Sequence, residues 1–215
     1  MNGAALILAG GKSKRMGMDK ALIQFRNKPL LLHAVKTVLT LVNEVKVVIA
    51  KNDAPQKYSA ILPPEVQIIT DEIEGKGPLA GILAGMQNIR SEYVAVLPCD
   101  SPFIKTEVLA CLFCRAQEAD AAIPRWPDGR VEPLHSVYRV SSSVSAAKSS
   151  LQEEELLVID MVKRLGKVIY LDVDELRKFD RELITFFNIN NREDLLKAKM
   201  LEPILQDSTC TKQSF

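Results

Sequence analysis

Short apolar runs alternate with segments of helical spacing along most of the chain, and this alternation constrains the fold more than any other feature of the sequence. Six runs rich in Val, Ile, Leu and Ala are typical of buried strands: residues 4–9, 45–50, 66–70, 93–98, 121–123 and 168–171. Between them, apolar residues recur every three or four positions in residues 30–41, 79–89, 106–119 and 153–165, as on one face of a helix. This order predicts a mainly parallel sheet with helices on both faces.

The length of 215 residues suits one large α/β domain. We expect a single-domain, three-layer, Rossmann-like sandwich over residues 1–207, with an amphipathic last helix over residues 192–205 and a frayed tail at residues 208–215. The polar segment 141–150 lacks the Gly and Pro content of a flexible linker, so it is interpreted as a surface helix rather than a domain boundary.

Charge and cysteine usage narrow the functional class. Lys and Arg total 28 against 27 Asp and Glu, so the chain has no overall field that would attract nucleic acid or a membrane surface. No apolar run reaches the roughly 18 residues of a membrane span. Cys111 and Cys114 form a CxxC without a second ligand pair for zinc, and we interpret them as core-facing. The absence of a secretory pattern and of a cysteine framework predicts a cytoplasmic protein with reduced thiols.

The first predicted strand runs directly into a loop, residues 8–20, that concentrates glycine and positive charge. Gly10 and Gly11 permit close approach of the backbone and positive φ values, so that successive amides can point at phosphate oxygens. Ligands of open α/β sheets bind at this carboxyl edge of the strands. A polyanion is the expected guest, because four cations fall within nine residues: Lys12, Lys14, Arg15 and Lys20.

Two familiar phosphate-binding motifs do not fit this loop. A P-loop ending in Gly11-Lys12-Ser13 needs a glycine at position 6, where Leu6 stands. The dinucleotide fingerprint also fails, because Gly10 and Gly11 are adjacent. A solvated glycine-rich turn is the structural alternative, and the position after a buried strand favours the phosphate interpretation instead.

Two further strand ends carry carboxylates. Asp71 follows residues 66–70 and opens a glycine-rich loop into a helix, with Pro78 just inside the helix start, so the backbone could approach a flat ring or ribose here. Asp100 ends residues 93–98, and a hard oxygen ligand at a strand tip suits Mg²⁺. The alternatives are a turn without a ligand at Asp71 and an N-cap role for Asp100.

The full pattern LAGGKSKRMGMDKALIQFRNKPLLLH resembles the N-terminal signature of the molybdenum cofactor guanylyltransferases, within the wider glycosyltransferase-A-like nucleotidyltransferases. The resemblance implies a fold like that of the nucleotide-diphospho-sugar transferases. It also implies that the loop grips the nucleotide's base and phosphates. On this basis Lys20 and Arg15 would offset phosphate charge, and the nucleotide-contacting residues of the loop would be Leu8, Ala9, Gly10 and Gly11.

The same resemblance assigns roles further along the chain. It implies guanine recognition by Asp71 and the segment containing Gly77, Pro78 and Leu79, and it matches Asp100 to the family's metal-binding aspartate. Asn190, in the segment FNINN, could offer the metal a neutral oxygen, although a turn or cap role explains it equally well. His135, in EPLHSVY, would lie near the acceptor, although a lone histidine is more often structural. One departure is Ala50, where some relatives supply an Asn; Asn52 lies two residues on.

The expected function is a Mg²⁺-dependent transfer of GMP from GTP to molybdenum-molybdopterin, which releases pyrophosphate. Arg15, Lys20 and Asp100 would be the catalytic residues, and the expected partners are GTP, molybdenum-molybdopterin and other enzymes that make or receive the molybdenum cofactor. Two alternatives stay open from the sequence. One is a related enzyme that transfers a cytidylyl group, or a guanylyl group to another phosphorylated acceptor. The other is a non-catalytic adaptor that binds the cofactor.

Overall fold

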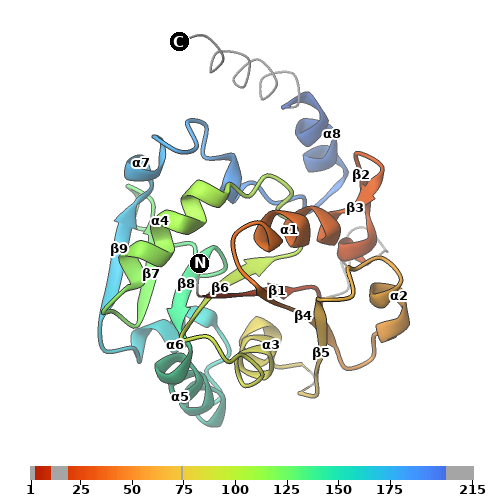
Figure 1. The fold of residues 1–215 in the computed structure, drawn as a ribbon. Helices are drawn as coiled ribbons and strands as arrows, with labels where there is room; N and C mark the ends of the chain where they lie inside the picture. The colour runs from red at the N-terminus through yellow and green to blue at the C-terminus, as the bar shows by residue number, and fades with distance from the viewer. Residues whose placement is uncertain (1–2, 11–18, 74, 202–215) are drawn as a thin grey trace.

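A computed structural model describes residues 3–10, 19–73 and 75–201, and its centre is a seven-stranded sheet (Figure 1). Strand β8 is antiparallel to both of its neighbours, whereas the other neighbouring pairs in the sheet are parallel. The predicted mainly parallel sheet is therefore confirmed. In spatial order the strands are β5 (Gln67–Asp71), β4 (Glu44–Ala50), β1 (Ala4–Leu8), β6 (Tyr93–Pro98), β8 (Ser136–Arg139), β7 (Ala121–Arg125) and β9 (Val168–Asp172).

Helices cover both faces of the sheet, as Figure 1 shows for α1 and α4 on one side and α3, α5 and α6 on the other. The first apolar core lies under α1 (Leu30–Leu39), α2 (Pro55–Ser59), α4 (Thr106–Ala116) and α7 (Val173–Leu176). The second lies under α3 (Gly77–Met86), α5 (Val140–Gln152) and α6 (Val158–Lys163). Strand β1 serves both cores, because Ala5 and Ile7 face the first and Ala4 and Leu6 face the second. This explains its continuous apolar sequence.

Helix α3 packs unusually close to the sheet at Gly85. A Cβ atom added there would lie 2.2 Å from Leu6 Cδ1 and 2.9 Å from Val48 Cγ2. Gly81, one turn earlier, has more room, since its added Cβ would lie 3.4 Å from Val48 Cγ1. Glycine at residue 85 thus allows the last turn of α3 to approach β1 and β4 closely.

A third, smaller core joins the N-terminal and C-terminal parts of the chain. It packs the 3-10 turn η1 (Lys20–Leu22) and the small hairpin of β2 (Gln24–Phe25) and β3 (Lys28–Pro29) near α8 (Arg192–Met200). Its buried members are Ile23, Phe25, Leu30, Phe103, Ile184, Ile189 and Ala198. This core brings the segment before α8, which includes the 3-10 turn η2 (Ile184–Phe186), to the sheet edge where β6 ends.

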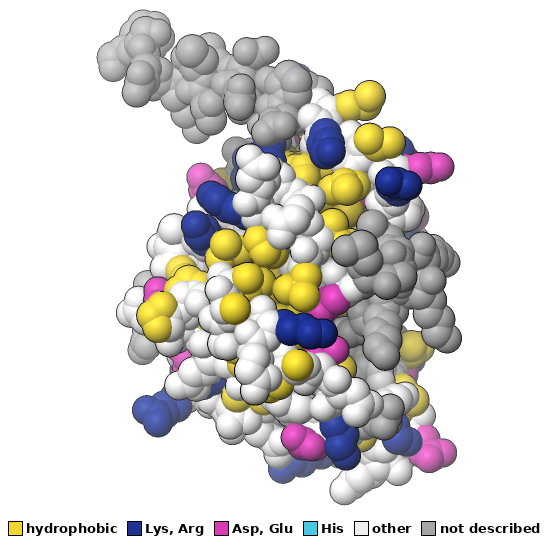
Figure 2. Space-filling view, turned by 90° about the vertical axis from the view of Figure 1, so that its right-hand side faces the viewer, with side chains coloured by type: hydrophobic (Ala, Val, Ile, Leu, Met, Phe, Trp, Pro, Cys, Tyr) yellow, Lys and Arg dark blue, Asp and Glu magenta, His cyan; other side chains and the backbone are white. Residues whose placement is uncertain are grey.

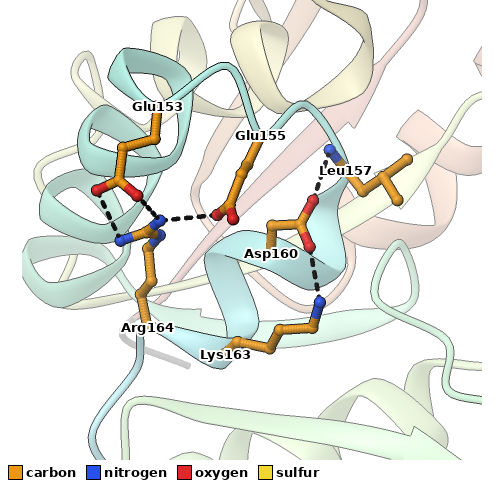
Figure 3. A network of polar contacts seen from close by, with 6 residues as sticks. All are labelled: Glu153, Glu155, Leu157, Asp160, Lys163 and Arg164. Carbon is orange, nitrogen blue, oxygen red and sulfur yellow. Dashed lines mark hydrogen bonds and ion pairs between the residues drawn. The ribbon is translucent and has the colours of Figure 1, made fainter.

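The segment before α6 differs from the sequence prediction. A helix was expected over residues 153–165, but α6 begins at Val158, and residues 153–157 form the α5–α6 connection. Arg164 holds this connection by donating to Glu153 Oε2 at 2.6 Å and to Glu155 Oε2 at 2.7 Å (Figure 3). These charge-assisted bonds compete with continuation of the helix.

Other predictions had mixed outcomes. Segment 141–150 is helical within α5, as predicted, and α8 confirms the last amphipathic helix as far as Met200. The end of that predicted helix, residues 202–205, lies outside the described residues, and so does the predicted tail 208–215, which contains Cys210. The prediction that Cys111 and Cys114 face the core is wrong for Cys114, which is exposed; Cys111 is half-buried. Among the helices of the described residues, none is long and apolar enough to cross a membrane.

Candidate active site

A cleft of about 1110 Å³ opens where β1, β4, β5 and β6 end. Because these four strands are parallel neighbours, their carboxyl ends meet at one edge, where open α/β sheets bind ligands. Figure 2 looks onto the side of the molecule toward which β1 runs in Figure 1, and apolar side chains gather in the middle of that face. The cleft brings together nine of the residues singled out in the sequence: Leu8, Ala9, Gly10, Lys20, Asp71, Gly77, Pro78, Asp100 and Asn190.

Gly10 lies where the chain leaves β1, and its role differs from the one expected. Its φ is not positive; the positive values near the cleft belong to Gly75 (77°) and Gly77 (69°). What Gly10 requires is space, since a Cβ there would lie 2.9 Å from the backbone nitrogen of Ala50. The missing side chain lets the backbone at Gly10 lie directly against the end of β4. Gly11 and Arg15, also singled out in the sequence, lie outside the described residues.

Lys20 begins η1, and the residue before it is held by two hydrogen bonds. Asp19 caps the turn by accepting from the Ala21 amide at 3.0 Å, and its other oxygen accepts from the Tyr58 hydroxyl at 2.6 Å. Tyr58 comes from α2 and is fully buried. Burial, together with the Asp19 carboxylate, raises the pKa of Tyr58, so its hydroxyl remains a donor at neutral pH. The hydrogen bond from Tyr58 in α2 therefore holds the backbone that carries Lys20.

The Lys20 ammonium group joins two oxygens from distant parts of the sequence. Its Nζ lies 2.9 Å from Asp100 Oδ2 and 2.6 Å from Asn190 Oδ1. The Asp100 side chain is only 11% exposed, against 23% for Lys20. The second carboxylate oxygen, Asp100 Oδ1, is buried and has no hydrogen-bond partner among the described residues. A buried, half-satisfied carboxylate in a cleft is typical of a ligand-binding position.

Asn190 reaches this position through backbone contacts on both sides. The preceding amide, of Ile189, donates to the Asp100 carbonyl at 2.9 Å. The Asn190 amide donates to Asp194 Oδ2 at 2.9 Å, and Asn191 caps α8 by accepting from the Asp194 amide at 2.9 Å. Asn191 is therefore the N-cap of α8. Asn191 performs the capping, which leaves the side chain of Asn190 free to face the cleft.

The opposite wall of the cleft contains Asp71 and the start of α3. Asp71 Oδ1 accepts from the Ile73 amide at 2.9 Å, and burial raises the pKa of the Asp71 carboxyl. Pro78 lies in the first turn of α3, as predicted. The predicted contact by Leu79 is not supported for its side chain, which is fully buried in the core beneath α3 rather than in the cleft. The helical period turns residue 79 toward the sheet.

The α5–α6 connection lies just behind this wall. A Cβ added to Gly77 would lie 3.8 Å from the carbonyl oxygen of Leu156, and Lys76 lies 3.6 Å from a carboxylate oxygen of Glu154. The Arg164 pairs that hold the connection therefore also support the loop that enters α3.

His135 is a structural residue in this fold. It is 1% exposed and does not line the cleft. Its Nε2 lies 2.9 Å from Ser101 Oγ, its Nδ1 lies 3.7 Å from Glu132 Oε2, and its ring packs edge-on against Phe186. The neighbouring Leu134 lines the cleft instead. Of the two roles that the sequence left open for His135, its burial favours the structural one.

Sequence analysis named Ala50 and Asn52 without giving them a role, and it missed Asp53 and Tyr58. Ala50, Asn52 and Asp53 line the cleft together after β4, and Asp53 Oδ2 accepts from the Ala50 amide at 3.2 Å. The contribution of Tyr58 has no sequence signal, since α2 is too short to produce a periodic pattern.

Comparisons with known proteins show which family and which solved structures the chain is similar to. The family model of the MobA-like NTP transferase domain matches residues 5–165. A protein of Methanosarcina mazei named "probable molybdenum cofactor guanylyltransferase" is 37% identical, over 89% of this chain and 88% of its own. The molybdenum cofactor guanylyltransferase of Syntrophotalea carbinolica is 34% identical, over 94% and 92%. The crystal structure of molybdopterin-guanine dinucleotide biosynthesis protein A from Archaeoglobus fulgidus superimposes with a TM-score of 0.80 at 30% identity, over 92% of this chain and 97% of that one.

Proposed function

The chain belongs to the family of MobA-like NTP transferase domains, and from this premise we propose that it is a molybdenum cofactor guanylyltransferase. The reaction would transfer GMP from GTP to the terminal phosphate of molybdenum-molybdopterin and release pyrophosphate. The observation that carries the proposal is the convergence of Lys20, Asp100 and Asn190 at one end of a cleft whose other wall holds Asp71. One cation and two hard oxygen ligands thus lie across the cleft from Asp71, a carboxylate that could bind a base.

The cleft gives each part of GTP a chemically suitable wall. Asp71 and the glycine-rich start of α3 suit the guanine, because a carboxylate can accept from both the N1–H and the amino group of guanine, a pattern that adenine does not offer. Lys20 and the loop after β1 suit the phosphates. At about 1110 Å³ the cleft is slightly larger than the roughly 300–1,000 Å³ of small-molecule sites, which leaves room for part of the acceptor.

The residues present fit a magnesium ion. Mg²⁺ binds proteins through one or two carboxylates and completes its shell with water and substrate phosphate oxygens. Asp100 supplies a buried carboxylate with an unpartnered oxygen, and Asn190 supplies a neutral oxygen beside it. When bound there, the ion would withdraw charge from the phosphates.

Catalysis in this site requires positioning and charge stabilisation. The acceptor phosphate oxygen forms a new bond to the α-phosphorus of GTP while the bond from that phosphorus to the bridging oxygen of pyrophosphate breaks. The acceptor is already an anion at neutral pH, so no general base is needed. Lys20 would stabilise the charge that builds on the phosphates, and Arg15, from the undescribed part of the loop, would add a second cation.

The proposal is tested by incubating the protein with molybdopterin loaded with molybdenum and each of the four nucleoside triphosphates, followed by separation of the products. GTP should give the guanine dinucleotide and pyrophosphate. Asp100→Ala should lower the rate of transfer by at least about 100-fold while GTP still binds. Asp128→Ala, in an exposed turn where Asp128 pairs only with its neighbour Arg130, is the matched control. Product formed from CTP instead of GTP, or full activity of Asp100→Ala, would refute the assignment.

A further inference from the structure

The Lys20 ammonium group lies between the same two oxygens that suit a divalent metal. Its Nζ is within hydrogen-bond distance of both Asp100 Oδ2 and Asn190 Oδ1. These oxygens come from the end of β6 and from the segment before α8, and they share Lys20 as a hydrogen-bond partner. A cation of the protein itself therefore holds them together.

Two cations cannot share this position without cost. A metal ion bound between Asp100 and Asn190 would lie within a few ångströms of the Lys20 nitrogen, and at that distance even two unit positive charges repel each other. A divalent ion would be repelled more strongly. The metal and the Lys20 ammonium group are thus alternatives at Asp100 unless Lys20 moves away.

Lys20 can move away without a change in the fold. Its backbone is held by the Asp19 cap and by the Tyr58 hydroxyl, so the η1 turn stays in place. The four-carbon side chain is partly exposed and lines the cleft. Triphosphate oxygens in the cleft would give the ammonium group new charge-assisted partners and compensate for the loss of Asp100.

We infer that Lys20 fills the metal position of the free protein and is exchanged for the divalent ion only when a nucleoside triphosphate enters. The inference deepens the proposed function and rests on it for the identity of the nucleotide. The lysine would act twice, first as an internal cation that keeps Asp100 paired and excludes free metal, then as a phosphate ligand. Metal bound to the triphosphate would therefore enter the site far more readily than metal alone.

The test measures Mn²⁺ binding to the full chain in the absence of any nucleotide, by the loss of the free-ion electron paramagnetic resonance signal. Lys20→Met removes the internal cation and should bind Mn²⁺ at least about tenfold more tightly than the unmodified protein, a change of roughly 1.4 kcal/mol. Lys20→Ala, as a second variant, should show the same gain. The double variant Lys20→Met/Asp100→Asn should lose it, because the gain depends on the Asp100 carboxylate.

Lys51→Met is the matched control, because Lys51 also lines the cleft and its loss removes the same charge. Its Mn²⁺ affinity should stay within about threefold of the unmodified protein, since screened charges at longer range contribute little. Equal Mn²⁺ affinity of the unmodified protein and Lys20→Met, or an equal gain in Lys51→Met, would overturn the inference. No nucleotide or pterin takes part, so a failure of guanylyl transfer would leave this measurement unaffected.

Discussion

Helix α3 contains two glycines whose replacement by alanine should have opposite effects on stability. Gly81 and Gly85 are both buried on the sheet side of the helix, one turn apart. Alanine is the better helix former at either position by about 1 kcal/mol. The difference must therefore come from what each new methyl group would contact.

The distances decide the sign. At Gly81 the nearest atoms to an added Cβ are at 3.4 Å and 3.5 Å, which is ordinary contact, so Gly81→Ala should stabilise the free protein by up to about 1 kcal/mol. At Gly85 the nearest atom, Leu6 Cδ1, is at 2.2 Å, which is roughly 1.5 Å inside the optimal carbon–carbon separation. Leu6 is itself fully buried, so overpacking of up to about 3 kcal/mol should exceed the helix gain and leave a net loss of about 1–2 kcal/mol.

Urea unfolding without ligand measures both variants against the unmodified protein. The midpoint should rise for Gly81→Ala and fall for Gly85→Ala, and each kcal/mol should move the melting temperature by about 2–4 °C. In a Leu6→Ala background the cost of Gly85→Ala should become smaller, because the clash with Leu6 is gone and only that with Val48 Cγ2 at 2.9 Å remains. If Gly85→Ala proves as stable as Gly81→Ala, or costs as much in the Leu6→Ala background, the steric reasoning is refuted.

Three further predictions concern residues outside the cleft lining. Tyr58→Phe removes the hydroxyl that donates to Asp19, and the backbone that carries Lys20 should shift. Initial rates of GMP transfer should therefore fall by about tenfold or more, and an unchanged rate would contradict this positioning role. Burial alone raises the pKa of Glu44, but hydrogen bonds from Arg90 and Ser91 outweigh it and lower that pKa. The stability from Glu44 is therefore present above its unfolded pKa and is lost as pH falls through the lower folded value. Glu44→Gln should cost about 1 kcal/mol at pH 7, and this cost should shrink steadily as the pH is lowered below the unfolded pKa, in a pH series of urea unfolding; a cost that does not change with pH would argue against it. Arg164→Met should release the α5–α6 connection and raise the KM for GTP with little change in kcat, in steady-state kinetics; an unchanged KM would mean that the connection does not support the cleft wall.

Strand ends made most of the site predictable. Leu8, Asp71 and Asp100 each follow or end an apolar run, and parallel neighbours bring such ends to one edge whatever the loops between them do. The continuous apolar runs of the buried strands and the helical spacing of α4 were therefore sufficient to predict the layers of the fold and one wall of the cleft. The role of Asn190 depended on the family resemblance, because its local sequence fits a cap equally well.

The features that escaped prediction depend on contacts between segments far apart in the chain. Strand β8 is short and its antiparallel position between β6 and β7 is set by pairing, not by a local pattern. The late start of the helix expected over residues 153–165 depends on the pairing of Arg164 with Glu153 and Glu155. Gly10 was explained in the sequence by its backbone conformation, but the structure requires it for close packing. The Ala50 amide that it packs against is 40 residues away in the sequence.

The central position of β1 has a consequence for the order in which the protein is made. Strand β1 pairs with β4 on one side and with β6 on the other, and both partners follow it in the chain. While the chain emerges from the ribosome, β1, β4 and β5 can form a three-stranded sheet, but the second edge of β1 stays open until residues 93–98 have followed. Asp100 arrives with that closing strand, and Asn190 arrives about 90 residues later. Strand β1, whose end opens the cleft, is thus made before both of its partners, and the cleft lining is completed only when residue 190 has followed.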